Sequence, residues 1–98
     1  MFSDVDALIL PTQGIPNPTI FEMNDIAQRP NGRNEMLRFT APFALSGSPS
    51  LVLPCGFVTP GVPIAFQLIG RQMEEDLLFR LGHAYQNSTS WHEQHPDL

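Results

Sequence analysis

The sequence predicts an α/β fold, with about three strands of a mixed sheet and two or three helices. Two apolar segments flank Pro60-Gly61 and predict a hairpin over residues 50–69. A third apolar run, Val5–Leu10, is closed by Pro11 and resembles a strand covered on both faces. The segment after the hairpin starts with three carboxylates and carries an apolar stripe, which predicts a helix.

Composition limits the size and the partners of the chain. Its 98 residues suffice for one domain at most, and 42% hydrophobic residues is close to the globular average. The net charge of −5 leaves no basic patch for a phosphate backbone, so we expect no nucleic-acid partner. With one cysteine, Cys55, and no run of about 18 apolar residues, we expect no membrane partner and a cytoplasmic location.

The first half of the chain predicts a strand, a loop and a short helix. Residues 11–18 contain three prolines and are expected to form a loop. A helix is expected to begin near Ile20 and to end before Gln28. Its apolar face consists of Ile20, Phe21, Met23 and Ile26.

The following segment favours one or two further helices. Asn34 is a candidate cap for a helix whose first turn contains Glu35. Pro42 interrupts the apolar pattern, so either one helix kinks there or a second helix begins with Thr40 as its N-cap. We favour the second interpretation, with Gly47 at the position after the helix.

The last part of the sequence predicts a hairpin and a C-terminal helix. Pro54 is expected to stop or bend the strand that begins at Ser50, and Pro60-Gly61 fits a type II turn before the return strand. The last helix should begin at the carboxylates of residues 74–76, end near Asn87, and leave a polar tail pinned by Trp91. Its predicted buried stripe consists of Met73, Leu77, Leu78, Leu81, Ala84 and Tyr85.

These elements do not cover one another. Three strands that are apolar on both faces need a layer on each side, and the few expected helices cannot supply both. The chain should therefore expose more apolar surface than a monomer normally shows. We expect it to be part of a larger protein or an obligate oligomer.

Residue chemistry alone indicates no active site. Cys55 lies between Pro54 and Gly56 and is better explained as a packing residue than as a nucleophile. The spacing of His92 and His95 fits metal ligands, but no second cluster accompanies it, so we expect no metal. The serines of residues 46–50 are explained by backbone capping and the carboxylates of residues 74–76 by the helix dipole. We expect no catalytic residue and no cofactor in this chain.

Several motifs, in order, resemble the C-terminal part of the amidase signature family. The resemblance spans nearly the whole chain except residues 20–35. The motifs are Asp6-Ala7-Leu8-Ile9-Leu10-Pro11-Thr12, Phe39-Thr40-Ala41-Pro42-Phe43, Leu45-Ser46-Gly47-Ser48-Pro49, Leu53-Pro54-Cys55-Gly56-Phe57, Gly61-Val62-Pro63, Gln67-Leu68-Ile69-Gly70-Arg71, Leu77-Leu78, His83-Ala84-Tyr85, Trp91-His92 and His95-Pro96.

The resemblance implies a mixed sheet between helical layers and hydrolysis of carboxamides by a Ser–cis-Ser–Lys triad. The Gly/Ser-rich signature is missing here and the chain contains no lysine, so residues 1–98 correspond to one partial domain, the C-terminal segment of an amidase. By the same resemblance, Thr40 and Phe43 border the substrate pocket, although core packing explains them equally well. Ala44 departs from the family pattern, which usually has asparagine there.

Three hypotheses remain open. The first is an amidase segment that is inactive alone and whose partner is the missing N-terminal part. The second is a structural or interaction module, derived from an amidase, that is stabilised by self-association. The third is a segment of the A subunit of a tRNA-dependent amidotransferase, which has the same catalytic fold.

Overall fold

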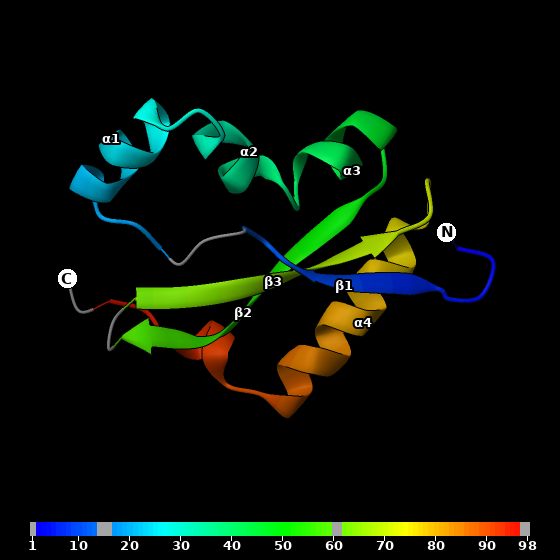
Figure 1. The fold of residues 1–98 in the computed structure, drawn as a ribbon. Coiled ribbons are helices and arrows are strands. Elements are labelled where there is room, and N and C mark those ends of the chain that lie inside the picture. The colour runs from blue at the N-terminus through cyan, green and yellow to red at the C-terminus, as the bar shows by residue number, and fades with distance from the viewer. Residues whose placement is uncertain (1, 14–16, 60–61, 97–98) are drawn as a thin grey trace.

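A computed structural model describes residues 2–13, 17–59 and 62–96 (Figure 1). The predicted α/β class is confirmed. The elements in chain order are β1 (Ala7–Pro11), α1 (Ile20–Gln28), α2 (Gly32–Leu37), α3 (Ala41–Ser46), β2 (Ser50–Thr59), β3 (Val62–Gly70), α4 (Glu75–Ser88) and a 3-10 helix, η1 (Trp91–Glu93). Pro60 and Gly61, the predicted type II turn, lie outside the described residues.

The three strands form one sheet in the order β1-β3-β2, so the last strand in sequence lies in the centre. Strands β2 and β3 form the predicted hairpin, with Leu51 opposite Leu68, and β1 pairs with the other edge of β3. Both pairings are antiparallel. No parallel pair, the other component of the mixed sheet expected from the sequence, occurs among the described residues.

Pro54 bends β2, as the sequence predicts, but does not end it. The register with β3 shifts between Pro54 and Gly56, so one extra residue, Cys55, bulges out of the ladder. Bulges of this kind accommodate a proline and increase the local twist of the strand. The strand therefore continues to Thr59.

Helices lie on both sides of the sheet (Figure 1). On the α4 side, the buried core residues are Leu53 of β2 and Leu78 of α4. On the side of α1, α2 and α3, Gln67 and Ile69 of β3 are buried. Because β1 and β2 both pair with β3, each face of the sheet is continuous across all three strands.

Neither face is fully covered. Ile9 of β1 lies opposite Leu68 on the α4 face and is 69% exposed, because α4 packs on β2 and β3. Val52 of β2 lies opposite Gln67 on the other face and is 55% exposed. The structure thus confirms that these elements cannot cover both faces of the sheet.

Helix α4 buries a different stripe from the one predicted. The buried residues are Leu78 and Gly82, with Leu77 and Tyr85 half-buried. Gly82 packs against the sheet, since a Cβ atom there would lie 2.6 Å from a methyl group of Leu51. The prediction was wrong for Met73, Leu81 and Ala84, which are exposed.

The short helices agree with the sequence in part. Helix α1 spans the predicted residues, but of its apolar face Ile26 is buried while Ile20 and Phe21 are more than 80% exposed. The predicted cap of α2 was wrong: the helix begins at Gly32, after Asn31, and Asn34 lies inside it. Asn31-Gly32 is a typical turn pair, and here the turn continues directly into the helix.

The C-terminal tail is attached through an aromatic pair, as predicted. The ring of Trp91 in η1 meets the ring of Phe57 in β2 edge-on, with 6.0 Å between the centroids. Edge-to-face pairs at this separation are favourable beyond the area they bury. Trp91 therefore anchors the residues that follow α4.

The molecule is more open than a compact monomer of its mass. Its accessible surface is 7250 Å2, whereas the usual scaling gives about 5,600 Å2 for a folded monomer of 10.9 kDa. Its radius of gyration is 15.3 Å, against about 12.6 Å for a compact chain of this length. The excess surface includes many of the apolar side chains that the sequence predicts to be buried.

Candidate functional site

The candidate site is the α3 segment, residues 39–47, which contains both predicted pocket residues. Thr40 is the N-cap residue of α3 and Pro42 lies in its first turn, so the second of the two helix interpretations is confirmed. Gly47 ends the helix with φ 75°, a left-handed conformation that glycine adopts without strain. These local signals fix where α3 begins and ends.

The predicted pocket residues differ in exposure. Thr40 is exposed, and its Oγ1 has the carbonyl oxygen of Leu37 as a partner only at 3.5 Å, the long limit of a hydrogen bond. Its side chain makes no capping bond to α3. Phe43, one turn later, is half-buried, and Ala44 is exposed. The structure therefore brings a weakly engaged hydroxyl and an aromatic ring to the same short helix.

A buried glutamine fixes the start of the α3 segment. Gln67 in the central strand is 3% exposed, and its Nε2 donates to the carbonyl oxygens of Phe39 at 2.6 Å and of Pro11 at 2.9 Å. One amide thereby joins the end of β1, the middle of β3 and the residue before Thr40. Both amide hydrogens are used, which offsets the cost of burying this polar group.

The other end of the α3 segment is held by exposed hydrogen bonds. Gln72 Nε2 donates to the carbonyl oxygen of Ser46 at 2.7 Å. Ser46 Oγ donates to the carbonyl oxygen of Phe43 at 3.1 Å and lies 2.9 Å from Ser48 Oγ. The serines thus satisfy local backbone groups, as expected from the sequence.

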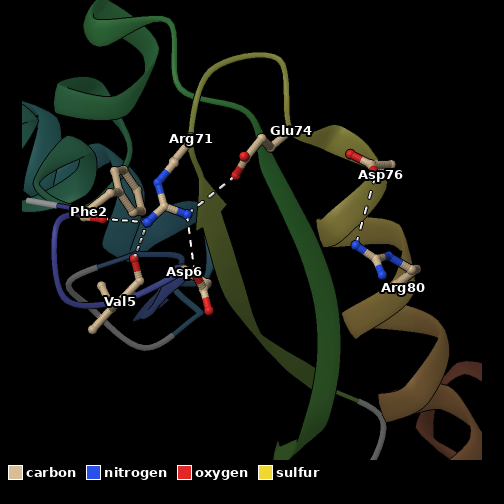
Figure 2. A network of polar contacts seen from close by, with 7 residues as sticks. All are labelled: Phe2, Val5, Asp6, Arg71, Glu74, Asp76 and Arg80. Carbon is tan, nitrogen blue, oxygen red and sulfur yellow. Dashed lines mark hydrogen bonds and ion pairs between the residues drawn. The ribbon is translucent and has the colours of Figure 1, made fainter.

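Arg71 ties the N-terminal residues to the end of β3 (Figure 2). Its guanidinium donates to the carbonyl oxygens of Phe2 and Val5, the latter at 2.9 Å. It also forms ion pairs with Asp6 at 3.3 Å and Glu74 at 3.5 Å and lies over the Phe2 ring. A planar group with five donors suits such a convergence of acceptors.

Within residues 2–13, 17–59 and 62–96, the other chemistry-bearing residues show no second grouping. Cys55 is a free, half-buried thiol at the bulge of β2. In the part of the chain that the structure describes, no three residues of His, Cys, Asp or Glu are grouped as metal ligands. A search of the same residues found no helix of the length and apolarity needed to cross a membrane.

The family resemblance implies Thr40 and Phe43 as pocket residues, which stays a prediction, whereas Gln67 and Arg71 were not predicted to organise the fold. Both occur in the motif Gln67–Arg71, which supports the family resemblance but does not by itself show what the two side chains contact. A glutamine in an otherwise apolar central strand is the signal that could have identified Gln67, because a buried amide requires partners. Its partners lie 28 and 56 residues away in sequence, so they could not be predicted.

Comparisons with known proteins show the family of the chain. The Amidase family model matches residues 1–79, so the chain belongs to the amidase signature family. It is 42% identical over 98 residues to the putative amidase AmiD of Mycobacterium tuberculosis, covering all of this chain and 21% of that protein. It is 41% identical over 97 residues to the A subunit of the glutamyl-tRNA(Gln) amidotransferase of Picosynechococcus, covering 99% of this chain and 19% of that protein.

The match is complete for this chain and partial for its relatives. The chain spans about a fifth of the length of the curated relatives it matches. No solved structure matches it. The recognition made from the motifs is therefore confirmed, and the matched portion is consistent with a fragment of an amidase-family protein.

Proposed function

We propose that residues 1–98 are one partial domain, the C-terminal segment of an amidase that hydrolyses carboxamide C–N bonds. The Ser–cis-Ser–Lys triad lies in the N-terminal part of the longer protein. The observation that carries this proposal is the 42% identity over the whole chain to a putative amidase of which it covers 21%. The absence of lysine from the sequence supports it, because the triad base has no candidate here.

The chain contributes structure to the enzyme rather than reactive groups. Its sheet continues a larger sheet, and the α3 segment borders the substrate pocket with Thr40 and Phe43. Three observations support this role: the exposed and weakly engaged hydroxyl of Thr40, the partial burial of Phe43, and the anchoring of the segment by Gln67.

Its partner is the N-terminal part of the amidase. Apolar side chains are exposed on both sheet faces, with Ile9 on one and Val52 on the other, which supports a covering layer on each side. We place the protein in the cytoplasm, with no nucleic acid, membrane or metal as partner. The net charge of −5 supports the exclusion of nucleic acid, and the single cysteine suits a reducing compartment.

A chimaera tests this function. The fifth of the mycobacterial relative that matches this chain is replaced by residues 1–98, and hydrolysis of small carboxamides is compared with the unmodified relative. The expected result is a folded chimaera that retains hydrolysis and loses it when the lysine of the relative's amidase signature is replaced. A chimaera that folds but no longer hydrolyses amides that the parent does would refute the proposed contribution.

A second candidate is a segment of an amidotransferase A subunit. The identity of 41% to such a protein is nearly equal to the 42% to the putative amidase, which keeps this candidate open. By family resemblance the two candidates have the same catalytic fold, so the fold does not distinguish them. Glutamine and simple amides as alternative substrates in the chimaera distinguish the two, since a glutamine preference that transfers with residues 1–98 favours the amidotransferase.

A further inference from the structure

We propose that Gln67 is a positioning residue that sets the place of the α3 segment relative to the sheet. The role rests on the proposed function in one respect: it matters for catalysis because the segment borders the pocket. Helix α3 itself is poorly packed. None of its six residues is fully buried, and Ala41 and Phe43 are only half-buried, so hydrophobic contacts hold it weakly.

Hydrogen bonds at its two ends take the place of packing, and they are not equivalent. At the C-terminal end, Gln72 is exposed, so water competes with its bond to Ser46. At the N-terminal end, Gln67 is buried in the central strand and its bond to the Phe39 carbonyl is partly shielded from water. The buried end therefore determines the position of the segment.

The second hydrogen bond of Gln67 fixes the orientation of its side-chain amide. Its other amide hydrogen is donated to the Pro11 carbonyl at the end of β1, at 2.9 Å. Pro11 pairs with Phe66, so this carbonyl is fixed by the sheet ladder. The planar amide, held at one hydrogen by the sheet, then presents the other hydrogen to Phe39 in a single orientation. Thr40 follows Phe39 directly and takes its position from that bond.

Three variants separate a hydrogen-bond role from a packing role. Gln67→Leu removes both donors at similar volume. Gln67→Glu, when ionised, places a carboxylate against two carbonyl oxygens, whereas its neutral form can donate one hydrogen. Gln72→Leu is the matched control at the exposed end of the same segment.

The measurement is hydrogen exchange of residues 39–47, corrected for the intrinsic effect of pH, with α4 as the internal reference. Gln67→Leu at neutral pH, and Gln67→Glu at a pH above the raised pKa of its carboxyl, should lower protection of the segment at least about tenfold, and Gln72→Leu should lower it less. Burial and the facing carbonyls raise the pKa of the introduced carboxyl, so protection in Gln67→Glu should recover as the pH falls through that raised pKa.

Four outcomes overturn the proposal. The first is an equal loss of exchange protection in the Gln67 and Gln72 variants, and the second is no recovery of protection in Gln67→Glu at low pH. The third is a loss of protection confined to α4, and the fourth is an unsubstituted chain in which residues 39–47 are not protected. In the chimaera, Gln67→Leu should raise KM more than it lowers kcat, since it displaces a pocket border and no reacting group. If exchange shows that Gln67 holds the α3 segment but KM is unchanged, the positioning role stands. Only the assignment of the segment to the pocket border is then refuted.

Discussion

At the scale of single residues, Arg71 is the clearest example of long-range organisation. Its guanidinium reaches Asp6, 65 residues away in sequence, and two backbone carbonyls of the N-terminal segment (Figure 2). Two of these acceptors are neutral, so salt screens only part of the interaction. For holding the N-terminal segment, the planar arrangement of N–H donors in the guanidinium matters more than its charge.

Arg71→Lys should therefore release residues 2–6 although it keeps the charge. The expected cost is about 1 kcal/mol in the free energy of unfolding, with faster hydrogen exchange of residues 2–6. Arg80→Lys is the control, because the ion pair of Arg80 with Asp76 is exposed and 3.9 Å long, and it should change stability by less than about 0.5 kcal/mol. Equal changes in the two variants would contradict this role of Arg71.

Gly32 offers a steric prediction at the same scale. A Cβ atom there would lie 1.7 Å from the backbone carbonyl oxygen of Ile26, so Gly32→Ala must separate α1 from α2. The expected cost is about 1–3 kcal/mol, with loss of exchange protection over residues 20–37.

Gly82→Ala is the matched control for that substitution. Its nearest atom is a methyl group of the Leu51 side chain, which can rotate away, and alanine raises helix propensity. The change in stability should therefore be smaller than for Gly32→Ala. Intact protection of residues 20–37 in Gly32→Ala would contradict the close packing of the two helices.

Local residue signals were sufficient where neighbours in sequence decide the structure. Pro42 in the first turn and Gly47 after the last delimit α3, because these preferences depend on a few adjacent residues, whereas Thr40 takes the N-cap position without a side-chain cap. The same reasoning failed at Asn34, since the turn at Asn31-Gly32 passes into the helix without a side-chain cap. Gln67 and Arg71 could not be assigned because their partners come from distant segments.

At the scale of elements, α4 and the bulged strand β2 are joined by Tyr85. Its hydroxyl donates to the Pro54 carbonyl at 2.8 Å, and its ring meets Phe66 edge-on at 5.0 Å. The hydroxyl thus satisfies a carbonyl next to the bulge at Cys55. The ring and the hydroxyl make separable contributions.

Tyr85→Phe should cost about 1 kcal/mol in the free energy of unfolding, because it leaves the Pro54 carbonyl without this donor and keeps the ring contact. Tyr85→Ala should cost more, since the aromatic pair is lost as well. Urea unfolding followed by circular dichroism measures both. A Tyr85→Phe variant as stable as the unsubstituted chain would show that the hydroxyl bond adds nothing.

The buried residues of α4 were predicted in part from the hydrophobic periodicity of the sequence. The pattern predicted a helix over the right residues, and Leu78 and Tyr85 were assigned correctly to the sheet side. The pattern did not predict that Gly82 is buried. A glycine adds no hydrophobic side chain to the pattern, although its small size lets α4 approach the sheet closely. The helix is rotated toward that glycine, which leaves Leu81 and Ala84 exposed.

At the scale of the whole molecule, uncovered apolar surface is the main property. The sequence predicted it from strands that are apolar on both faces, and the structure confirms it with Ile9 and Val52. The arrangement of helices around the sheet was not predictable, because it depends on contacts between distant segments.

The isolated chain should self-associate, in line with its accessible surface of 7250 Å2. Sedimentation velocity should show concentration-dependent association. The double variant Ile20→Asp, Phe21→Glu should reduce it and keep helix content, because acidic residues suit the first turn of α1. Gln28→Lys, at an exposed polar position, is the control.

The form of the association separates two of the hypotheses. A discrete, well-folded dimer would favour a self-associating module, and heterogeneous aggregates favour a segment that lacks its covering layers. A monomer at every concentration would contradict the inference that the apolar faces need a partner.

Under the proposed function, this chain supplies a border of an amidase pocket and none of its reacting groups. The most direct test of this central claim is an assay of the purified 98-residue chain against small carboxamides, with a Ser46→Ala, Ser48→Ala variant as the control for an unexpected serine nucleophile. We expect no hydrolysis above the buffer rate at any pH. Turnover that copurifies with the chain and is lost in the serine variant would contradict the claim.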